Sequence, residues 1–175
     1  MAKSSIQRIK DDGRKVLAEL QKHSKENIDL IAKNCGFSRQ KVWRYVKQFE
    51  ENRLIWGYTA VVDGQQQGVQ KFILLLKRTQ KKFDDKTLDE ITRDKFKNAY
   101  EPMGITIESS YYVNGEYDWM VIFTASDLIQ AKKFSNILFE HHPGIAEKVN
   151  LMQIIFTQRD HYITNPDQTN LREFV

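Results

Sequence analysis

The chain has 175 residues, of which 41% are hydrophobic and 11% aromatic, a composition typical of one ordinary folded domain or two small ones. It has no apolar run as long as a membrane-spanning helix, and its polar N-terminus lacks the pattern of a secretory signal. A single cysteine, Cys35, allows no internal disulfide, and four scattered histidines do not show zinc-ligand spacing. We therefore expect a cytoplasmic protein with no membrane partner, no metal and no cofactor.

The net charge of +4 is distributed unevenly. Residues 1–63 carry 13 Lys or Arg against 8 Asp or Glu, whereas residues 64–175 carry 14 against 15. A basic segment joined to a nearly neutral one is typical of a nucleic-acid-binding head on a body with another role. The alternative is a solvated cationic surface, which charge alone does not exclude.

Two helices are predicted at the start of the chain. Residues 11–23 place apolar side chains at helical spacing after two carboxylates, which favour a helix N-terminus. Residues 28–34 form the second helix. It ends before Gly36, because glycine adopts the left-handed conformation of helix ends without a Cβ penalty. Ser38 can then cap a third helix by accepting a backbone N–H.

The third predicted helix, residues 39–51, has two different faces. Val42 and Tyr45 belong to an apolar stripe that packs on the other helices, and the opposite stripe is cationic and polar. Two helices joined by a tight turn form a helix-turn-helix, whose second helix enters the major groove of double-stranded DNA. The alternative is a plain helical hairpin with a solvated charged face. The predicted DNA-binding residues are Ser38, Arg39, Gln40, Trp43, Arg44 and Lys47, since Arg pairs with guanine, Gln with adenine, and Lys and Ser hold phosphates.

A strand and a hinge are predicted next. Residues 55–62, IWGYTAVV, are rich in β-forming side chains and end at Asp63-Gly64. Residues 64–70 are polar and flanked by glycines, which indicates a hinge. The domain boundaries follow from these elements. Residues 1–63 form the helix-turn-helix domain with its exit strand, residues 71–157 form the body, and residues 158–175 form a polar tail, either disordered or wrapped around a partner subunit.

The body is predicted to have the order β-α-β-β-α-β. This order is typical of an α+β, ferredoxin-like split unit with a four-stranded antiparallel sheet and helices on one face. Since the other sheet face would expose apolar side chains, the architecture predicts self-association. The predicted strands are residues 71–76, 105–113, 119–124 and 148–157, and the predicted helices are residues 88–100 and 128–141. The apolar sides of the two helices are expected to be Leu88, Ile91, Phe96 and Tyr100 in the first and Ile129, Phe134, Ile137 and Leu138 in the second.

Residues 11–63 resemble the N-terminal domain of the Lrp/AsnC (leucine-responsive/asparagine-regulator) transcription factors of bacteria and archaea. The chain departs from that family at Tyr45, where a second arginine is usual, and at Arg53, where a glycine is usual. Asn52 is expected to supply the left-handed helix cap instead. The matching residues are Val16-Leu17-x-x-Leu20, Ile31-Ala32, Ser38, Arg44, Val46, Phe49-Glu50 and Ile55-x-Gly57-Tyr58-Thr59-Ala60.

The body resembles the regulatory (RAM) domain of the same family, so that the resemblance covers about residues 11–157. The resemblance implies that the strand at residues 55–62 pairs with its copy in a second subunit, and that homodimers assemble into tetramers or octamers. It also implies that small molecules, often amino acids, bind between dimers near the turn at residues 113–118. The matches are Val113-Asn114-Gly115-Glu116-Tyr117-Asp118, Asp127 and Pro143-Gly144-Ile145, and the segment EPMGITIESSYY before the turn is longer than is usual.

The predicted effector-binding residues are Asn114, Gly115, Tyr117 and Asp118. A carboxylate at a strand start can accept from an ammonium group, and backbone amides near Gly115 can hold a carboxylate, a combination that suits an α-amino acid. The alternative is a hairpin turn in which nearby backbone satisfies Asp118.

An enzyme is the weaker alternative. His141-His142 ends a predicted helix, where histidine commonly caps carbonyls, and no serine, cysteine or carboxylate is placed by a motif to work with it. We therefore predict no catalytic residue. The sequence predicts a sequence-specific, oligomeric DNA-binding transcriptional regulator, modulated by a small molecule such as an amino acid. An architectural DNA-binding protein without an effector is the competing reading.

Overall fold

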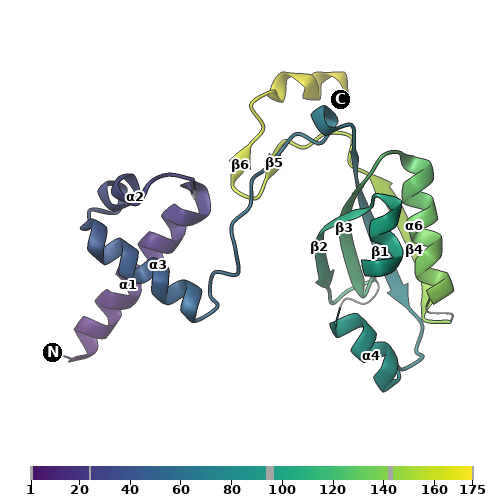
Figure 1. Cartoon of the computed structure of the whole chain (residues 1–175), viewed down its shortest axis with the longest axis horizontal. Helices are drawn as coiled ribbons and strands as arrows, with labels where there is room; N and C mark the ends of the chain where they lie inside the picture. The colour runs from purple at the N-terminus through teal and green to yellow at the C-terminus, as the bar shows by residue number, and fades with distance from the viewer. Residues whose placement is uncertain (1, 24, 94–96, 142–143, 175) are drawn as a thin grey trace. The chain divides into compact units, whose positions relative to one another are not determined.

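The computed structural model describes residues 2–23, 25–93, 97–141 and 144–174 (Figure 1). The chain divides into two compact units. The first is Met1–Val61 with Gln158–Gln168, and the second is Val62–Thr157 with Thr169–Val175.

Three helices form the first unit: α1 (Ala2–His23), α2 (Ile28–Cys35) and α3 (Arg39–Glu51). The second and third match the predicted ranges to within one residue. The first was predicted to begin at Asp11 but begins at Ala2, because no proline or glycine interrupts residues 2–10. The core lies where the three helices meet, and its buried side chains are Val16, Leu20, Ile31, Ala32, Val42 and Tyr45.

The end of α3 corrects one prediction. Asn52 has an ordinary right-handed backbone, with φ −82°, whereas Arg53 takes the left-handed conformation, with φ 56°. The amide of Leu54 donates to the carbonyl of Phe49 at 2.8 Å, and that of Arg53 donates to Glu50 at 3.0 Å. This is the hydrogen-bond pattern of a Schellman motif, which requires the residue after the cap to be left-handed. The arginine therefore occupies the glycine position directly.

Residues 55–62, predicted as a strand, have no regular secondary structure here. A strand needs a partner for its backbone groups, and no described segment of the chain pairs with this one. Residues 56–62 are exposed to solvent, and Trp56 is 95% exposed. Ile55 packs against the helical core and its amide donates to the carbonyl of Phe49 at 3.1 Å, and the Tyr58 hydroxyl donates to Glu50 Oε1 at 2.9 Å. The predicted hinge at residues 64–70 contains a short 3-10 helix, η1 (Gln65–Gln67), and the first residue of the sheet.

A four-stranded antiparallel sheet organises the second unit. Its strands lie in the order β2-β3-β1-β4, which confirms the predicted ferredoxin-like architecture. Each strand lies within a few residues of its prediction, and residues 154–157 fall outside the last. The strands are β1 (Gln70–Arg78), β2 (Thr106–Tyr112), β3 (Trp119–Ala125) and β4 (Ala146–Gln153).

The helices of this unit match the prediction less evenly. The helix α6 (Leu128–His141) has the predicted bounds, and Asp127 caps it by accepting the Gln130 amide at 2.7 Å. The single helix predicted over residues 88–100 is described in two pieces, α4 (Asp85–Thr92) and α5 (Lys97–Tyr100), followed by η2 (Glu101–Met103). Phe96, placed on its apolar side, lies outside the described residues.

The core of the second unit lies between the helices and one face of the sheet. Phe123 stacks on Phe72 at 5.6 Å and packs on Phe134 of α6 at 4.7 Å between ring centroids. Two predicted core residues are wrong: Ile129 is 69% exposed, and Leu88 is exposed as well. In α6 the buried positions are Ala131, Phe134, Ser135 and Leu138, so the apolar stripe lies about one residue further round the helix than Ile129.

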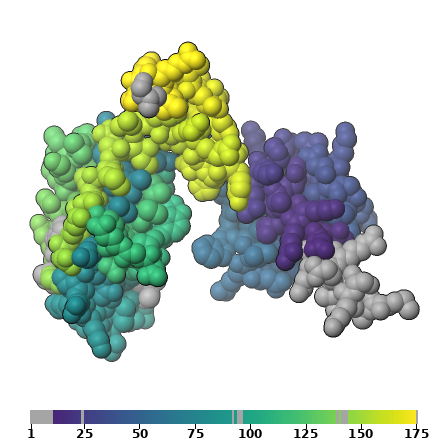
Figure 2. Space-filling view, turned by 180° about the vertical axis from the view of Figure 1, so that it is seen from behind, coloured from purple at the N-terminus to yellow at the C-terminus, as the bar shows by residue number. Residues whose placement is uncertain are grey.

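The opposite sheet face is only half-buried, and it carries Ile73, Leu75, Met120 and Ile122. Strands β1 and β4 are antiparallel neighbours in the sheet, and their residues lie side by side at the surface in Figure 2. The sequence left the tail at residues 158–175 open between disorder and wrapping around a partner. In the structure it forms a small strand pair, β5 (Arg159–Asp160) with β6 (Ile163–Thr164), and the 3-10 helix η3 (Gln168–Glu173).

Within the described part of the chain, no helix has the length and apolarity needed to cross a bilayer. The acidic, histidine and cysteine side chains of those same residues form no group of three that is suited to a metal ion.

Candidate DNA-binding interface

The turn between α2 and α3 fixes the helix-turn-helix. Gly36 has φ 71°, in the region that favours glycine, and the next amide, that of Phe37, donates to the carbonyl of Ala32 at 2.9 Å. Two residues on, Ser38 Oγ accepts the amide of Lys41 at 3.3 Å and so caps α3. The cap leaves the Ser38 hydroxyl hydrogen available to a further acceptor such as a phosphate oxygen.

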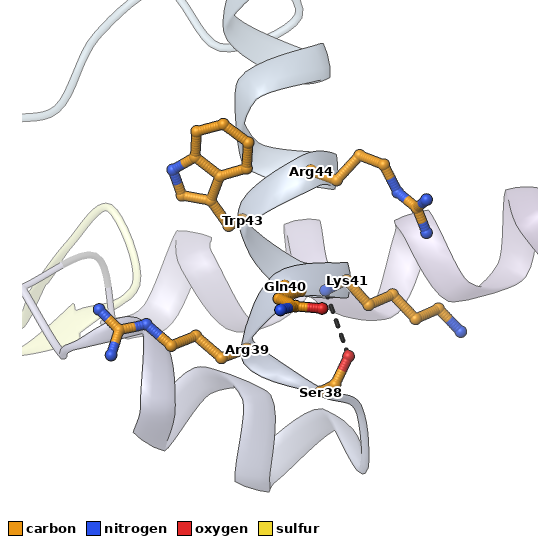
Figure 3. A pocket seen from close by; sticks show the side chains of 6 residues that line it. All are labelled: Ser38, Arg39, Gln40, Lys41, Trp43 and Arg44. Atoms are coloured by element: carbon orange, nitrogen blue, oxygen red, sulfur yellow. Dashed lines mark hydrogen bonds between the residues drawn. The ribbon is translucent and has the colours of Figure 1, made fainter.

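The outer face of α3 presents the predicted DNA-binding side chains to solvent (Figure 3). Arg39 and Trp43 project to one side of the helix, Arg44 projects to the other, and Gln40 lies between them. With Ser38 and Lys41 these residues line an open hollow of about 550 Å³. Lys47 is exposed one turn further along α3. The structure therefore brings all six predicted residues to one face of the first unit.

The side chains on this face differ in their intramolecular partners. Arg39 forms an exposed ion pair with Asp29 of α2 at 3.3 Å, and Lys47 lies 3.7 Å from Glu51. Gln40 and Arg44 form no hydrogen bond or ion pair with any described residue. Because exposed ion pairs contribute at most about 1 kcal/mol, a phosphate can replace Asp29 or Glu51 at little cost.

Trp43 is 54% exposed, so it does not pack into the helical core. The ammonium of Lys47 lies 5.3 Å from the centre of the indole, within the range of a cation–π contact. This contact orients the flat, apolar indole of Trp43 at the edge of the cationic face.

Lys41 is a structural residue that the sequence pattern did not single out. Its Nζ lies 2.7 Å from Asp12 Oδ2, and both side chains are partly buried. The same ammonium lies 4.0 Å from the centre of the Phe37 ring. Lys41 therefore joins α3 to α1 and is not available to DNA in the way that Arg44 is. The pairing depends on two residues 29 positions apart, for which the sequence carries no signal.

The turn at residues 113–118 holds the predicted effector-binding residues. Asp118 Oδ2 accepts the backbone amide of Arg78 at 2.7 Å, so part of its carboxylate is already satisfied by the sheet. The Tyr117 hydroxyl accepts from the Asn150 side-chain amide. Asn114 and Gly115 are exposed. The structure thus brings the four residues into one turn and gives Asp118 and Tyr117 structural contacts.

Lys148 adds a charge beside this turn. Its Nζ lies 3.2 Å from Glu116 and 5.4 Å from the centre of the Tyr117 ring. Hydrogen bonding to Tyr117 and then to Glu116 raises the pKa of Lys148, so the ammonium stays charged over the physiological range.

Cys35 is the single thiol of the chain. Burial raises the pKa of the Cys35 thiol, and the carboxylate of Glu19 adds to the shift, so the reactive thiolate is disfavoured. His141 is the last residue of α6, and its neighbour His142 lies outside the described residues.

Comparison with known proteins agrees with the geometry. Residues 13–55 match the family model described as winged helix-turn-helix DNA-binding. No curated protein sequence matches the chain.

Solved structures match over most of the chain. An AsnC family transcriptional regulator from Agrobacterium tumefaciens is 18% identical with a TM-score of 0.64, covering 89% of this chain and 96% of its own. LrpC of B. subtilis is 20% identical with a TM-score of 0.59, covering 83% and 94%. A feast or famine regulatory protein from M. tuberculosis, complexed with L-methionine, is 15% identical with a TM-score of 0.67, covering 89% and 98%. The resemblance to the Lrp/AsnC regulators is confirmed at the level of fold: the chain has their helix-turn-helix head and their four-stranded antiparallel body.

Proposed function

We propose that the protein is a sequence-specific DNA-binding transcriptional regulator that acts in the cytoplasm as a homo-oligomer. The observation that carries this proposal is the outer face of α3. There the side chains of Gln40 and Arg44 lie exposed, without a hydrogen bond or ion pair to any described residue, on a capped helix that follows a tight turn. A helix with this exposure and charge fits the major groove of B-DNA.

Each side chain of this face has a chemical role in the proposal. Arg44 and Gln40 read base edges, because guanidinium and amide groups make paired hydrogen bonds with guanine and adenine. Ser38, Arg39 and Lys47 hold phosphates and set the register of the helix on the duplex. Trp43 packs on a sugar or on a thymine methyl group.

Self-association is part of the proposal. Two copies would place two α3 helices about one turn of DNA apart, on a roughly palindromic site. Two features support a dimer: the half-buried apolar sheet face that carries Ile73 and Ile122, and the segment at residues 55–62, which is exposed from Trp56 onward and pairs with no described strand. In a dimer this segment would pair with its copy and become the strand that its sequence predicts. Dimers would assemble further into tetramers or octamers.

An amino acid is the proposed effector. The M. tuberculosis neighbour is complexed with L-methionine, and the turn at residues 113–118 of this chain offers exposed amides at Asn114 and Gly115. In this proposal those amides bind the effector carboxylate, and the free oxygen of Asp118 with Tyr117 receives the ammonium. The effector would act by favouring one assembly over another, which couples its binding to DNA affinity.

The deciding experiment is a titration of labelled genomic fragments with the purified full chain at several salt concentrations. The test variant is Arg39→Ala with Arg44→Ala. The control is Arg93→Ala, which removes an exposed cation directly after α4 in the second unit. We expect tight, salt-sensitive binding to a few fragments by the unmodified protein and by the control, and loss of that selectivity in the double variant.

Two outcomes would contradict the proposal. Equal affinity for every fragment would indicate an architectural DNA-binding protein. Absence of binding at low salt would show that the helix-turn-helix is a scaffold only. Adding L-methionine and other amino acids to the same titration tests the effector, because binding or assembly must then change with the amino acid.

A further inference from the structure

The second unit contains a cavity that no part of the proposed DNA or effector site uses. It has a volume of about 460 Å³, within the range of roughly 300–1,000 Å³ that is usual for small-molecule sites. It lies at the end of the helix-covered sheet face, where Leu76, Ile105 and Leu138 form an apolar floor. All its lining residues belong to the second unit.

Arg78 brings a positive charge to this mostly apolar cavity. Its guanidinium lies 3.7 Å from the centre of the Phe83 ring, and one of its terminal nitrogens donates to the Lys81 carbonyl at 3.2 Å. Arg78 Nε is buried and has no hydrogen-bond partner among the described residues. Buried donors in proteins are almost always paired, so an orphaned guanidinium nitrogen indicates a missing acceptor.

Aromatic side chains form one wall of the cavity. Tyr112 and Trp119 are paired across β2 and β3, with ring centroids 6.2 Å apart and planes at 17°. The indole N–H already donates to Ser110 Oγ at 2.8 Å, so it does not compete for a ligand. Flat apolar surfaces of this kind suit a ring or a branched apolar group.

The charges around the cavity leave a net positive site. Lys97 and Glu101 also line it, but they pair with each other at 3.2 Å and largely cancel. Arg78 is left as the uncompensated charge. A ligand with one negative group would supply the acceptor that Nε lacks, and a guanidinium favours a carboxylate through charge-assisted hydrogen bonds.

We propose that this cavity binds a small monocarboxylate with an apolar, ring-sized body, and that Arg78 holds the carboxylate while Tyr112, Trp119 and Phe83 enclose the body. The site lies within one chain and is distinct from the turn proposed for the amino-acid effector. It nevertheless adjoins that turn, because the backbone amide of Arg78 donates to Asp118. Binding of the monocarboxylate in this cavity does not require DNA.

The test uses the full chain without DNA, with phenylacetate as the probe and phenylacetamide as its uncharged isostere. Calorimetric titration measures the two affinities, and heteronuclear NMR maps the shifted amides. We expect phenylacetate to bind about 10–100-fold more tightly than phenylacetamide, as a hydrogen bond to a charged group implies. The largest shifts are expected on β1, β2 and β3 around Arg78, Tyr112 and Trp119.

Two variants sharpen the test. Arg78→Gln removes the charge and should abolish the preference for the acid, while Arg78→Lys should retain part of it. Arg93→Gln, at an exposed position directly after α4, is the matched control and should bind as the unmodified protein does. Circular dichroism and amide dispersion establish that each variant is folded.

Three results would overturn the proposal. The first is no saturable binding of phenylacetate by the unmodified protein. The second is equal affinity of the unmodified protein for the acid and the amide. This measurement requires no variant, so it tests the proposal even if Arg78→Gln fails to fold. The third is binding that maps to residues 113–117 instead of the cavity, which would assign the acid to the proposed effector turn.

Discussion

The two compact units use their charged side chains differently. In the second unit, cations of β1 lie against carboxylates of other strands of the sheet: Lys71 Nζ is 2.7 Å from Glu108 of β2, and Lys77 Nζ is 2.9 Å from Glu147 of β4. On the outer face of α3 in the first unit, Arg44 has no ionic partner among the described residues. These two lysines of β1 are thus compensated by carboxylates, whereas the outer face of α3 carries an uncompensated cation.

This difference teaches where a polyanion can bind. A cation in a partly buried ion pair, such as Lys71 with Glu108, gains little from a phosphate, because the carboxylate is then left unpaired. A cation without a partner gains the full interaction. The net charge of the two halves of the sequence indicates that a polyanion binds the first unit. The pattern of ion pairs restricts the binding site to the outer face of α3.

The two units have separate cores, and the largest expected effect is the loss of a buried ring from the core of the second unit. Phe123→Ala removes a buried ring that contacts Phe72 and Phe134, and should lower the free energy of unfolding of the second unit by about 3–5 kcal/mol. Ile129→Ala, at an exposed position of α6, should change it by less than about 0.5 kcal/mol. Urea denaturation followed by circular dichroism measures both. Equal losses would mean that the described core is wrong.

The second prediction addresses the uncompensated face. Arg44→Ala should cost about 1–3 kcal/mol of specific DNA binding if Arg44 reads a base. Lys77→Ala, which removes a cation paired with Glu147 in the second unit, should leave the affinity for DNA unchanged. Fluorescence anisotropy with specific and random duplexes measures the loss. If Arg44→Ala weakens both duplexes equally, the residue holds only phosphate, and if Lys77→Ala weakens binding as much, the comparison between the units fails.

The third prediction compares two ion pairs within the first unit. Asp12→Ala breaks the partly buried pair with Lys41 and should lower the free energy of unfolding by about 1–2 kcal/mol. Asp29→Ala breaks the exposed pair with Arg39 and should change it by less than about 0.5 kcal/mol. Asp29→Ala should also tighten DNA binding, since it frees Arg39 and removes a carboxylate next to the duplex. Thermal unfolding and anisotropy check the two parts. Weaker DNA binding by Asp29→Ala would place Arg39 away from the DNA.

A smaller effect is expected at the end of α3. Arg53→Gly should raise the free energy of unfolding by about 0.5–1 kcal/mol, because glycine relieves the left-handed strain but loses more chain entropy. Asn52→Gly, at a right-handed position, should lower it. If Asn52→Gly raised the free energy of unfolding and Arg53→Gly left it unchanged, the left-handed residue would be Asn52, as the sequence predicted.

The smallest expected effect concerns Tyr58. Burial, followed by the hydrogen bond to Glu50, raises the pKa of Tyr58 to about 12. The folded-state pKa lies above the ordinary tyrosine value of about 10, so the stability from this contact is complete below pH 10 and is lost as the pH rises toward 12. Absorbance titration of the phenolate should show a late-titrating group that disappears in Tyr58→Phe and shifts to lower pH in Glu50→Gln. An unchanged midpoint in Glu50→Gln would mean that the contact does not form in solution.

The sequence by itself determined the elements whose signals are local. The cap at Ser38, the glycine at position 36 and the apolar spacing of Val42 and Tyr45 predicted α3 and its outer face, because caps and helical periodicity depend on neighbours along the chain. The alternation of strands and helices likewise predicted the ferredoxin-like body, which the sheet order confirms.

Tertiary structure decided what depends on contacts between distant residues. The segment at residues 55–62 has the composition of a strand, yet composition supplies no partner, and no described strand of the chain pairs with it. Lys41 of α3 is bound to α1 through Asp12, Asp118 accepts the amide of Arg78 on β1, and the cavity around Arg78 is lined by residues of all four strands of the sheet and of the helices that cover it. Such pairings depend on the path of the chain through space, because packing and charge act over a few ångströms regardless of separation in sequence.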